Sequence, residues 1–190
     1  MKCRHYKFIL TAFFIGVGLA CNSADQQSEA NKLVSEANNL TDKADVLIRK
    51  TEARNQKLFD ADIQTVEELE AYKIKMKSEA ESIIDCYTEA SEILKKIAKK
   101  FDEAAQMNVR EIYKDYAKIK SDEFTRRAAA LDIRKGNAQI FIEADLPGRM
   151  TDKFDENNSR FEQLMREAEE LSSAARNLEN ENRKFFAKFN

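Results

Sequence analysis

Apolar residues recur at alternating spacings of three and four along most of the chain, and this pattern limits the fold more than any other feature. It begins with two successive segments, 28–34 and 35–41, that are near-copies of each other. Their stripe consists of Ala30, Leu33, Ala37, Leu40, Ala44, Leu47, Thr51, Arg54 and Leu58. Such spacing places these side chains on one face of an α-helix, as in coiled coils. We therefore predict a first helix over about 28–60.

Residues that break helices are scarce. The 190 residues include Gly 4 and Pro 1, while 35% are charged and 43% are hydrophobic. A disordered chain of this polarity would be rich in proline and glycine and poor in large apolar residues, whereas this chain has Phe 12. The sequence predicts an all-α fold over residues 28–190: an elongated antiparallel helical bundle or coiled coil of three to four long helices.

The second helix is expected over 65–120. Thr65 and Glu68 have the spacing of a capping box, which places a chain reversal near 61–65. A new stripe follows from Leu69 to Phe101, and only Lys73 interrupts it. The helix could be broken near Asn108, at Ser121, where the apolar phase shifts, or not at all.

The last part of the chain predicts two more helices. One covers 122–144 and the other 150–188, with the turn Asp145-Leu146-Pro147-Gly148 between them. The stripe of the last helix is the most regular of all. It consists of Met150, Phe154, Asn157, Phe161, Leu164, Ala168, Leu171, Ala175, Leu178, Asn182, Phe185 and Phe189.

The first twenty residues have the pattern of a secretory signal peptide. Basic residues precede an apolar run over 8–17, and small residues lead to Cys21. The run is shorter than the roughly 20 residues that a membrane-spanning helix needs. The ending Leu19-Ala20-Cys21 resembles the lipobox of bacterial lipoprotein precursors, although Gly18 stands where that family usually has leucine.

This resemblance implies that the 1–20 signal peptide is removed and that Cys21 becomes a lipidated N-terminus. Residues 21–27 would then form a flexible tether. Asn22 is not the aspartate that retains many such proteins at the inner membrane, so export with a lipid anchor, favouring the outer membrane, is implied. The alternative is an ordinary secretory signal in which Cys21 is incidental.

Charge and composition argue against several functions. Removal of residues 1–20 changes the net charge from −2 to −5, which gives no basic face for nucleic acid. His5 is the single histidine and lies in the signal peptide, so no metal, cofactor or histidine-based catalysis is expected. The carboxylate pairs Glu67/Glu68 and Glu169/Glu170 lie away from the stripes, as solvated residues do. We expect no enzymatic activity.

A few residues depart from the pattern. Cys86, next to the stripe residue Tyr87, is expected to be a small buried side chain, with an intermolecular disulfide as the alternative. The polar stripe residues Lys73, Asn157 and Asn182 either fix the register or mark places where the bundle opens. Phe185 and Phe189 continue the last stripe, whereas Phe186 falls outside it; this aromatic end either caps the core or contacts a membrane surface.

The function that these features favour is a membrane-anchored, non-enzymatic scaffold, spacer or interaction module of the cell envelope. It would bind the membrane through its N-terminal lipid and have a protein partner or self-associate. The alternative is a periplasmic carrier whose phenylalanine-rich helices part to hold an apolar ligand.

Overall fold

The fold was analysed in a computed structural model, which describes the backbone of residues 5–144 and 147–187 and the side chains of 25–144 and 148–187. The helices are α1 (His5–Phe59), α2 (Val66–Gln106), α3 (Glu111–Glu143), α4 (Pro147–Glu181) and the single turn α5 (Arg183–Phe186). The structure is 92% helical, and the described residues contain no strand. The expected all-α bundle is confirmed.

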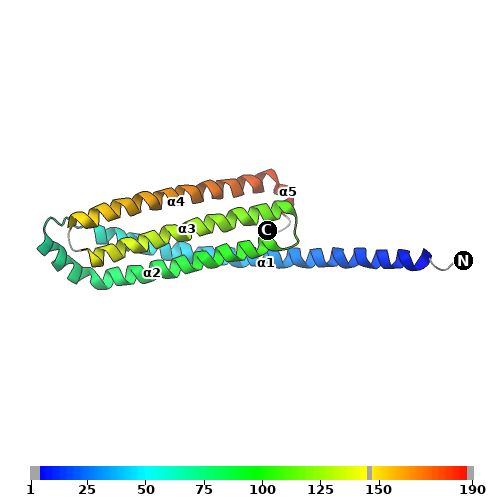
Figure 1. The fold of residues 1–190 in the computed structure, drawn as a ribbon, viewed down its shortest axis with the longest axis horizontal. Helices are drawn as coiled ribbons and strands as arrows, with labels where there is room; N and C mark the ends of the chain where they lie inside the picture. Colours follow the sequence, from blue (N-terminus) through cyan, green and yellow to red (C-terminus); the bar gives the residue numbers. More distant parts are fainter. Residues whose placement is uncertain (1–4, 145–146, 188–190) are drawn as a thin grey trace.

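The long helices run antiparallel and form an elongated rod (Figure 1). α2 packs against α1 and α3, and α3 packs against α2 and α4. One end of the rod carries the α1–α2 connection at 60–65 and the passage from α3 to α4; we call it the turn end. The other carries the α2–α3 connection at 107–110 and α5; we call it the α5 end. The first part of α1 extends beyond the α5 end (Figure 1).

The start of α2 follows the sequence prediction. The Thr65 hydroxyl accepts a hydrogen bond from the Glu68 backbone N–H at 3.2 Å, and the Glu68 carboxylate accepts one from the Thr65 N–H at 3.2 Å. This capping box satisfies two amides that the first helical turn cannot pair internally. It fixes the point at which the chain reverses after α1.

Of the two breaks considered beyond Phe101, the structure has the one near Asn108. α2 ends at Gln106 and α3 begins at Glu111, with Arg110 rather than Asn108 at the N-cap. The expected separation of 65–120 from 122–144 at Ser121 is wrong, because α3 continues through it. The Ser121 carbonyl accepts a bond from the Thr125 hydroxyl at 2.9 Å, and the shift in apolar phase is absorbed within one helix.

The start of α1 also differs from the sequence prediction. Residues 21–27, expected as a flexible tether, belong to the helix that begins at His5. Nothing between Gly18 and Gly136 is a glycine or proline that would end it. The Gln27 amide donates to Asn31 Oδ1 at 3.1 Å, and the Gln26 side chain accepts from the Asn108 backbone N–H. The first bond lies within α1, and the second joins this part of α1 to the α5 end of the rod.

The core lies mainly between α2 and its two neighbours. Its largest fully buried apolar side chains are Tyr87, Phe101, Phe141, Leu58, Leu69, Ile83, Leu94 and Ile97. In contrast, α4 buries only Ala168 and Ala175 fully among its described stripe residues, while its phenylalanines and leucines are half-buried. The most regular stripe of the sequence is therefore one of the less buried ones.

Candidate functional site

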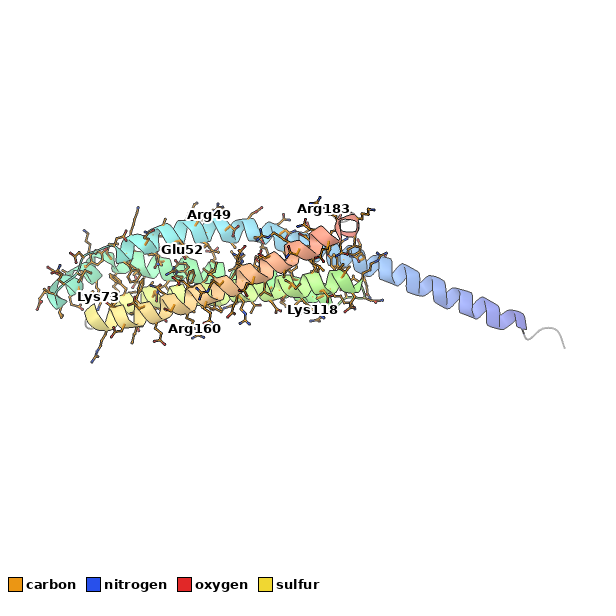
Figure 2. All side chains as sticks on the ribbon, turned by 90° about the horizontal axis from the view of Figure 1, so that it is seen from above. Arg49, Glu52, Lys73, Lys118, Arg160 and Arg183 are labelled. Atoms are coloured by element: carbon orange, nitrogen blue, oxygen red, sulfur yellow. The ribbon has the colours of Figure 1, made fainter. Side chains whose placement is uncertain are left out.

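A cleft runs along the rod between α1 and α4, which do not pack closely against each other. The two helices form its walls and α3 forms its floor, and we call it the α1–α4 cleft. It holds three hollows: one of 560 Å³ towards the turn end, one of 230 Å³ in the middle and one of 310 Å³ towards the α5 end. Figure 2 places Glu52 on the inner side of α1 and Arg49 on its outer side.

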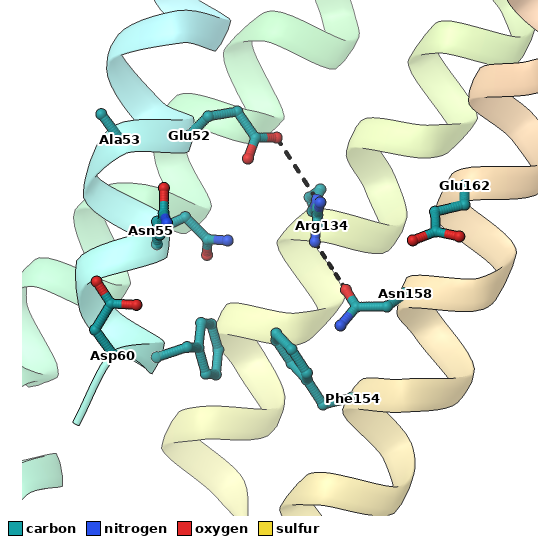
Figure 3. Close-up of a pocket in the computed structure, with 10 residues that line it drawn as sticks. Glu52, Ala53, Asn55, Asp60, Arg134, Phe154, Asn158 and Glu162 are labelled. Atoms are coloured by element: carbon teal, nitrogen blue, oxygen red, sulfur yellow. Dashed lines mark hydrogen bonds and ion pairs between the residues drawn. The ribbon is translucent and has the colours of Figure 1, made fainter. Parts of the chain in front are cut away.

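The 560 Å³ hollow is the largest of the three, and we call it the turn-end cavity. Figure 3 shows it opening between α1 and α4, with side chains from both walls directed into it. Its lining combines three carboxylates, one guanidinium, three amides and two phenylalanine rings. The residues are Glu52, Ala53, Asn55, Gln56, Phe59, Asp60, Arg134, Phe154, Asn158 and Glu162.

Arg134, which belongs to α3, lies at the centre of this cavity. Its guanidinium stacks on the Phe161 ring, with Cζ 3.8 Å from the ring centroid. Nη1 donates a hydrogen bond to Asn158 Oδ1 at 2.8 Å. Nε lies 3.6 Å from a Glu52 carboxylate oxygen, which is an ion pair without a hydrogen bond. Contacts from both walls thus fix the arginine in place, and Glu52 offsets its charge.

A group of asparagines joins α3 to α4 beside Arg134. Asn157, one of the polar residues in the last stripe, donates to Asn137 Oδ1 at 2.8 Å, and Asn137 donates to Asn158 Oδ1 at 3.2 Å. Asn137 is completely buried, so these bonds supply partners that water cannot. Gly136 of α3 lies next to Asn157, since a Cβ at position 136 would be 3.7 Å from Asn157 Nδ2. Asn157 therefore fixes the register of α4 on α3.

Besides Arg134 Nε, two buried polar atoms near the cavity lack a well-formed hydrogen bond among the described residues. Asn55 of α1 is 4% exposed, and its Oδ1 accepts no bond. The hydroxyl of Tyr87, which is fully buried on α2, likewise forms no hydrogen bond of good geometry, although it lies close to the Glu52 carboxylate. Burial raises the pKa of Tyr87 well above its usual range, and the negative charge of Glu52 adds to the shift. The phenol therefore stays neutral.

The middle hollow has a charged floor that the sequence did not reveal. Glu123 of α3 is 2% exposed and forms ion pairs with Lys120 at 2.6 Å and Arg127 at 2.9 Å. Lys120 also lies over the Phe124 ring, 4.8 Å from its centroid. Spacings of three and four residues between opposite charges are common on exposed helical faces, so nothing in the sequence pattern indicates that this carboxylate is buried.

The other unusual residues lie apart from the cleft. Lys73 Nζ donates to the Ala144 carbonyl at 2.7 Å, so the cation that breaks the α2 stripe holds the C-terminal end of α3. Cys86 is half-buried rather than fully buried, and its Sγ lies 3.9 Å from Arg54 Nη1. The thiol is free.

The aromatic end differs from the sequence prediction. Asn182 interrupts the helix and is the N-cap of α5, so it marks a break rather than a register contact. This break changes the helical phase, and Phe186, expected to fall outside the stripe, becomes buried against Tyr116 with ring centroids 5.2 Å apart. Phe185 is half-buried beside it, and Phe189 lies outside the described residues.

Cys21, the predicted lipidation site, belongs to α1, but its side chain lies outside the described residues. Among the side chains that the structure describes, no group of His, Cys, Asp or Glu is arranged to hold a metal ion. None of the described helices has a stretch both long and apolar enough to cross a bilayer. The predictions for Cys21 and for the cell envelope therefore still rest on the sequence.

Comparisons with known proteins give no match. No protein-family model matches the chain, no curated protein is similar to it, and no solved structure matches its fold. The functional argument therefore rests on the residues of this chain alone.

Proposed function

We propose that this chain is an exported, lipid-anchored protein of the cell envelope whose helical rod acts as a non-enzymatic spacer and interaction module. The observation that carries the proposal is the position of the lipobox-like cysteine relative to the rod. Cys21 precedes Gln26 by five residues on α1, and Gln26 contacts Asn108 at the α5 end. A helical rise of about 1.5 Å per residue puts the cysteine backbone only about 8 Å before that contact.

A lipid on Cys21 would therefore attach the rod to a membrane by its α5 end. The turn end would be the far one, because α2 has 41 residues and so extends for about 60 Å. An upright rod would present the α1–α2 connection at roughly that distance from the bilayer. Two or three acyl chains, at about 0.8 kcal/mol for each buried CH₂, suffice for stable anchoring.

The alternative function, a carrier of an apolar ligand, is less well supported by the side chains of the α1–α4 cleft. Its middle hollow has an apolar α4 wall, but Asp45 and Glu52 lie on the α1 wall. Its floor carries the charged residues Lys120, Glu123 and Arg127. The turn-end cavity holds carboxylates and Arg134. An apolar ligand would remove water from these charged groups without offering them partners, which is unfavourable.

The anchor is tested by labelling bacteria that express the full chain with a palmitate analogue. We expect label in the wild type and none in Cys21→Ala, with Cys86→Ala labelled like the wild type. Equal labelling of the wild type and Cys21→Ala would overturn the anchor, because acylation would then not depend on this thiol.

The interaction role is tested by photo-crosslinking in native membranes. Ile74, near the turn end of α2, is 78% exposed, which is the largest exposure of any large apolar side chain among the described residues. A photoreactive residue there should capture a specific protein, including another copy of this chain. The matched control is Lys99, an exposed side chain towards the α5 end of the same helix. An identical set of products from both positions would contradict a contact at the turn end.

A further inference from the structure

We propose that residues 170–186, the last part of α4 together with α5, form a latch that opens as a unit while the rest of the bundle stays folded. We call them the latch segment. The inference goes beyond the spacer function and does not depend on the lipid anchor. It rests on the different ways in which the two ends of α4 are held, and on the break that turns α5 towards α3.

The end of α4 near the turn end is held by polar side chains. Asn137 of α3 is hydrogen-bonded to Asn157 and Asn158, at 2.8 and 3.2 Å. Arg134 donates a further bond to Asn158 at 2.8 Å and stacks on the Phe161 ring. Three hydrogen bonds and a stacked guanidinium therefore join this end of α4 to α3.

The latch segment has much less to hold it along α4. In the described stretch 170–181, Ala175 is the one buried side chain, while Leu171 and Leu178 are half-buried. An alanine buries little apolar area, so its contribution is small. Glu179 lies beside Tyr116 and lines the same hollow at the α5 end. Without a further contact, this part of the helix would be the first to separate from α3.

The further contact comes from the break in the helix at Asn182. The backbone of Asn182 has φ −118° and ψ 30°, which is not helical, and its side-chain amide donates to the Leu178 carbonyl at 3.0 Å. Figure 1 shows that α5 turns from the end of α4 towards α3. The change of direction gives Phe186 a position that a continuous helix would not give it.

Phe186 is the one large side chain of the latch segment that is buried among the described residues, with 7% of its surface exposed. Its ring centroid lies 5.2 Å from that of Tyr116 and 6.5 Å from that of Tyr113, both on α3. The guanidinium of Arg110, at the start of α3, lies over the Phe185 ring with Cζ 5.3 Å from the centroid. These aromatic contacts attach the end of α4 to the start of α3.

Opening of the latch segment would uncover the rings of Tyr113 and Tyr116, which are buried and half-buried in the closed form. It would also widen the 310 Å³ hollow, because Glu179 and Phe186 belong to its lining. A helix end with few buried apolar contacts opens more readily than the core does. The packing of α5 therefore controls access to the aromatic surface at the α5 end of the α1–α4 cleft.

The latch is tested by hydrogen–deuterium exchange of the full chain in a neutral detergent, followed by mass spectrometry. We expect protection factors at least about tenfold lower over residues 170–181 than over residues 155–168 of the same helix, because the latch segment opens without the rest of α4. Equal protection of the two parts of α4 would overturn the proposal.

A variant identifies the side chain that closes the latch. Phe186→Ala should speed exchange over 170–181 at least about tenfold, with exchange over 155–168 and in α2 unchanged. The matched control, Phe154→Ala, removes a half-buried ring at the other end of α4 and should leave exchange over 170–181 unchanged. An equal rise in all helices, or no rise over 170–181, would contradict the latch. The wild-type comparison needs no substitution, so it decides the proposal even if Phe186→Ala fails to fold.

Discussion

The α2–α3 interface and the α1–α4 cleft are built from the same kind of apolar stripe, yet they differ in how much of it is buried. On α2, Phe101, Ile83 and Ile97 have no exposed surface. On α4, Phe154, Phe161 and Leu164 are only half-buried. The reason is the number of neighbours: α2 has a long helix on either side, whereas α4, among the described residues, packs along its length mainly against α3.

This difference shows that the regularity of a stripe does not measure its burial. A stripe as wide as that of α4 can be half covered by one helix, and the uncovered half then becomes the wall of a cleft. The covered interface supplies stability, while the open one leaves polar side chains such as Asn55 and Arg134 beside solvent-accessible space. Stability should therefore depend on the two regions unequally, and substitutions can test this.

The largest difference is expected between two phenylalanines. Phe101 is fully buried and stacks on Phe124 with ring centroids 5.8 Å apart, so Phe101→Ala should reduce the free energy of unfolding by about 3–5 kcal/mol. Phe154→Ala in the cleft wall should cost about 1 kcal/mol, because its ring is already partly in water. Urea unfolding followed by circular dichroism measures both. Equal losses would mean that the cleft is as tightly packed as the core.

The next effect concerns a charge on the cleft floor. Glu123→Gln should cost about 3 kcal/mol, because Lys120 and Arg127 would keep their charges beside a neutral amide. The control, Glu169→Gln, breaks an exposed ion pair with Arg176 and should change stability by less than about 0.5 kcal/mol. Salt titration of the unfolding midpoint adds a second measurement. A loss at Glu123 no larger than that at Glu169 would show that the floor is well solvated.

An alkaline effect is expected at the α5 end, where Tyr113 is buried near Phe186. Burial raises the pKa of Tyr113 to about 12, against about 10 in the unfolded chain. The folded state thus holds this proton over a range where the unfolded state has lost it, so stability falls as pH rises from about 10 to 12. When the pH is raised from 8 to 11, the free energy of unfolding of Tyr113→Phe should fall by about 1 kcal/mol less than that of the wild type. Urea unfolding at the two pH values measures this difference, and an equal loss of stability in the wild type and in Tyr113→Phe would contradict the prediction.

The sequence predicted the all-α fold and the start of α2 because helix formation depends largely on local features, although the separation expected at Ser121 and the tether expected over 21–27 were wrong. The capping box of Thr65 and Glu68 and the apolar periodicity predict where α2 begins and which face it buries. The break near Asn108 was less certain because no glycine or proline marks it. The end of α4 was not found, since Asn182 occupies an ordinary stripe position.

The candidate site could not be predicted, because it depends on how the helices are placed beside one another. Asn55, Arg134 and Glu162 come from three helices, and nothing in their local sequence shows that they share a cavity. An apolar stripe has the same spacing whether one helix or two cover it. The polar stripe residue Asn157 was the one signal near the site, and it proved to join α3 to α4 rather than to line the opening.

The smallest effect expected here concerns Lys73, which interrupts an otherwise apolar stripe of α2. Its side chain is 14% exposed and donates to the Ala144 carbonyl at the end of α3. A cation at a helix C-terminus typically contributes about 0.3–1 kcal/mol, so Lys73→Met should cost about that much, even though methionine suits the stripe better. The matched control is Lys77→Met on the same helix, whose side chain is 64% exposed and pairs with Glu81. If Lys73→Met instead raises stability in urea unfolding, apolar burial outweighs the carbonyl contact at the turn end. The polar residue would then not be needed to hold α3 in place against α2.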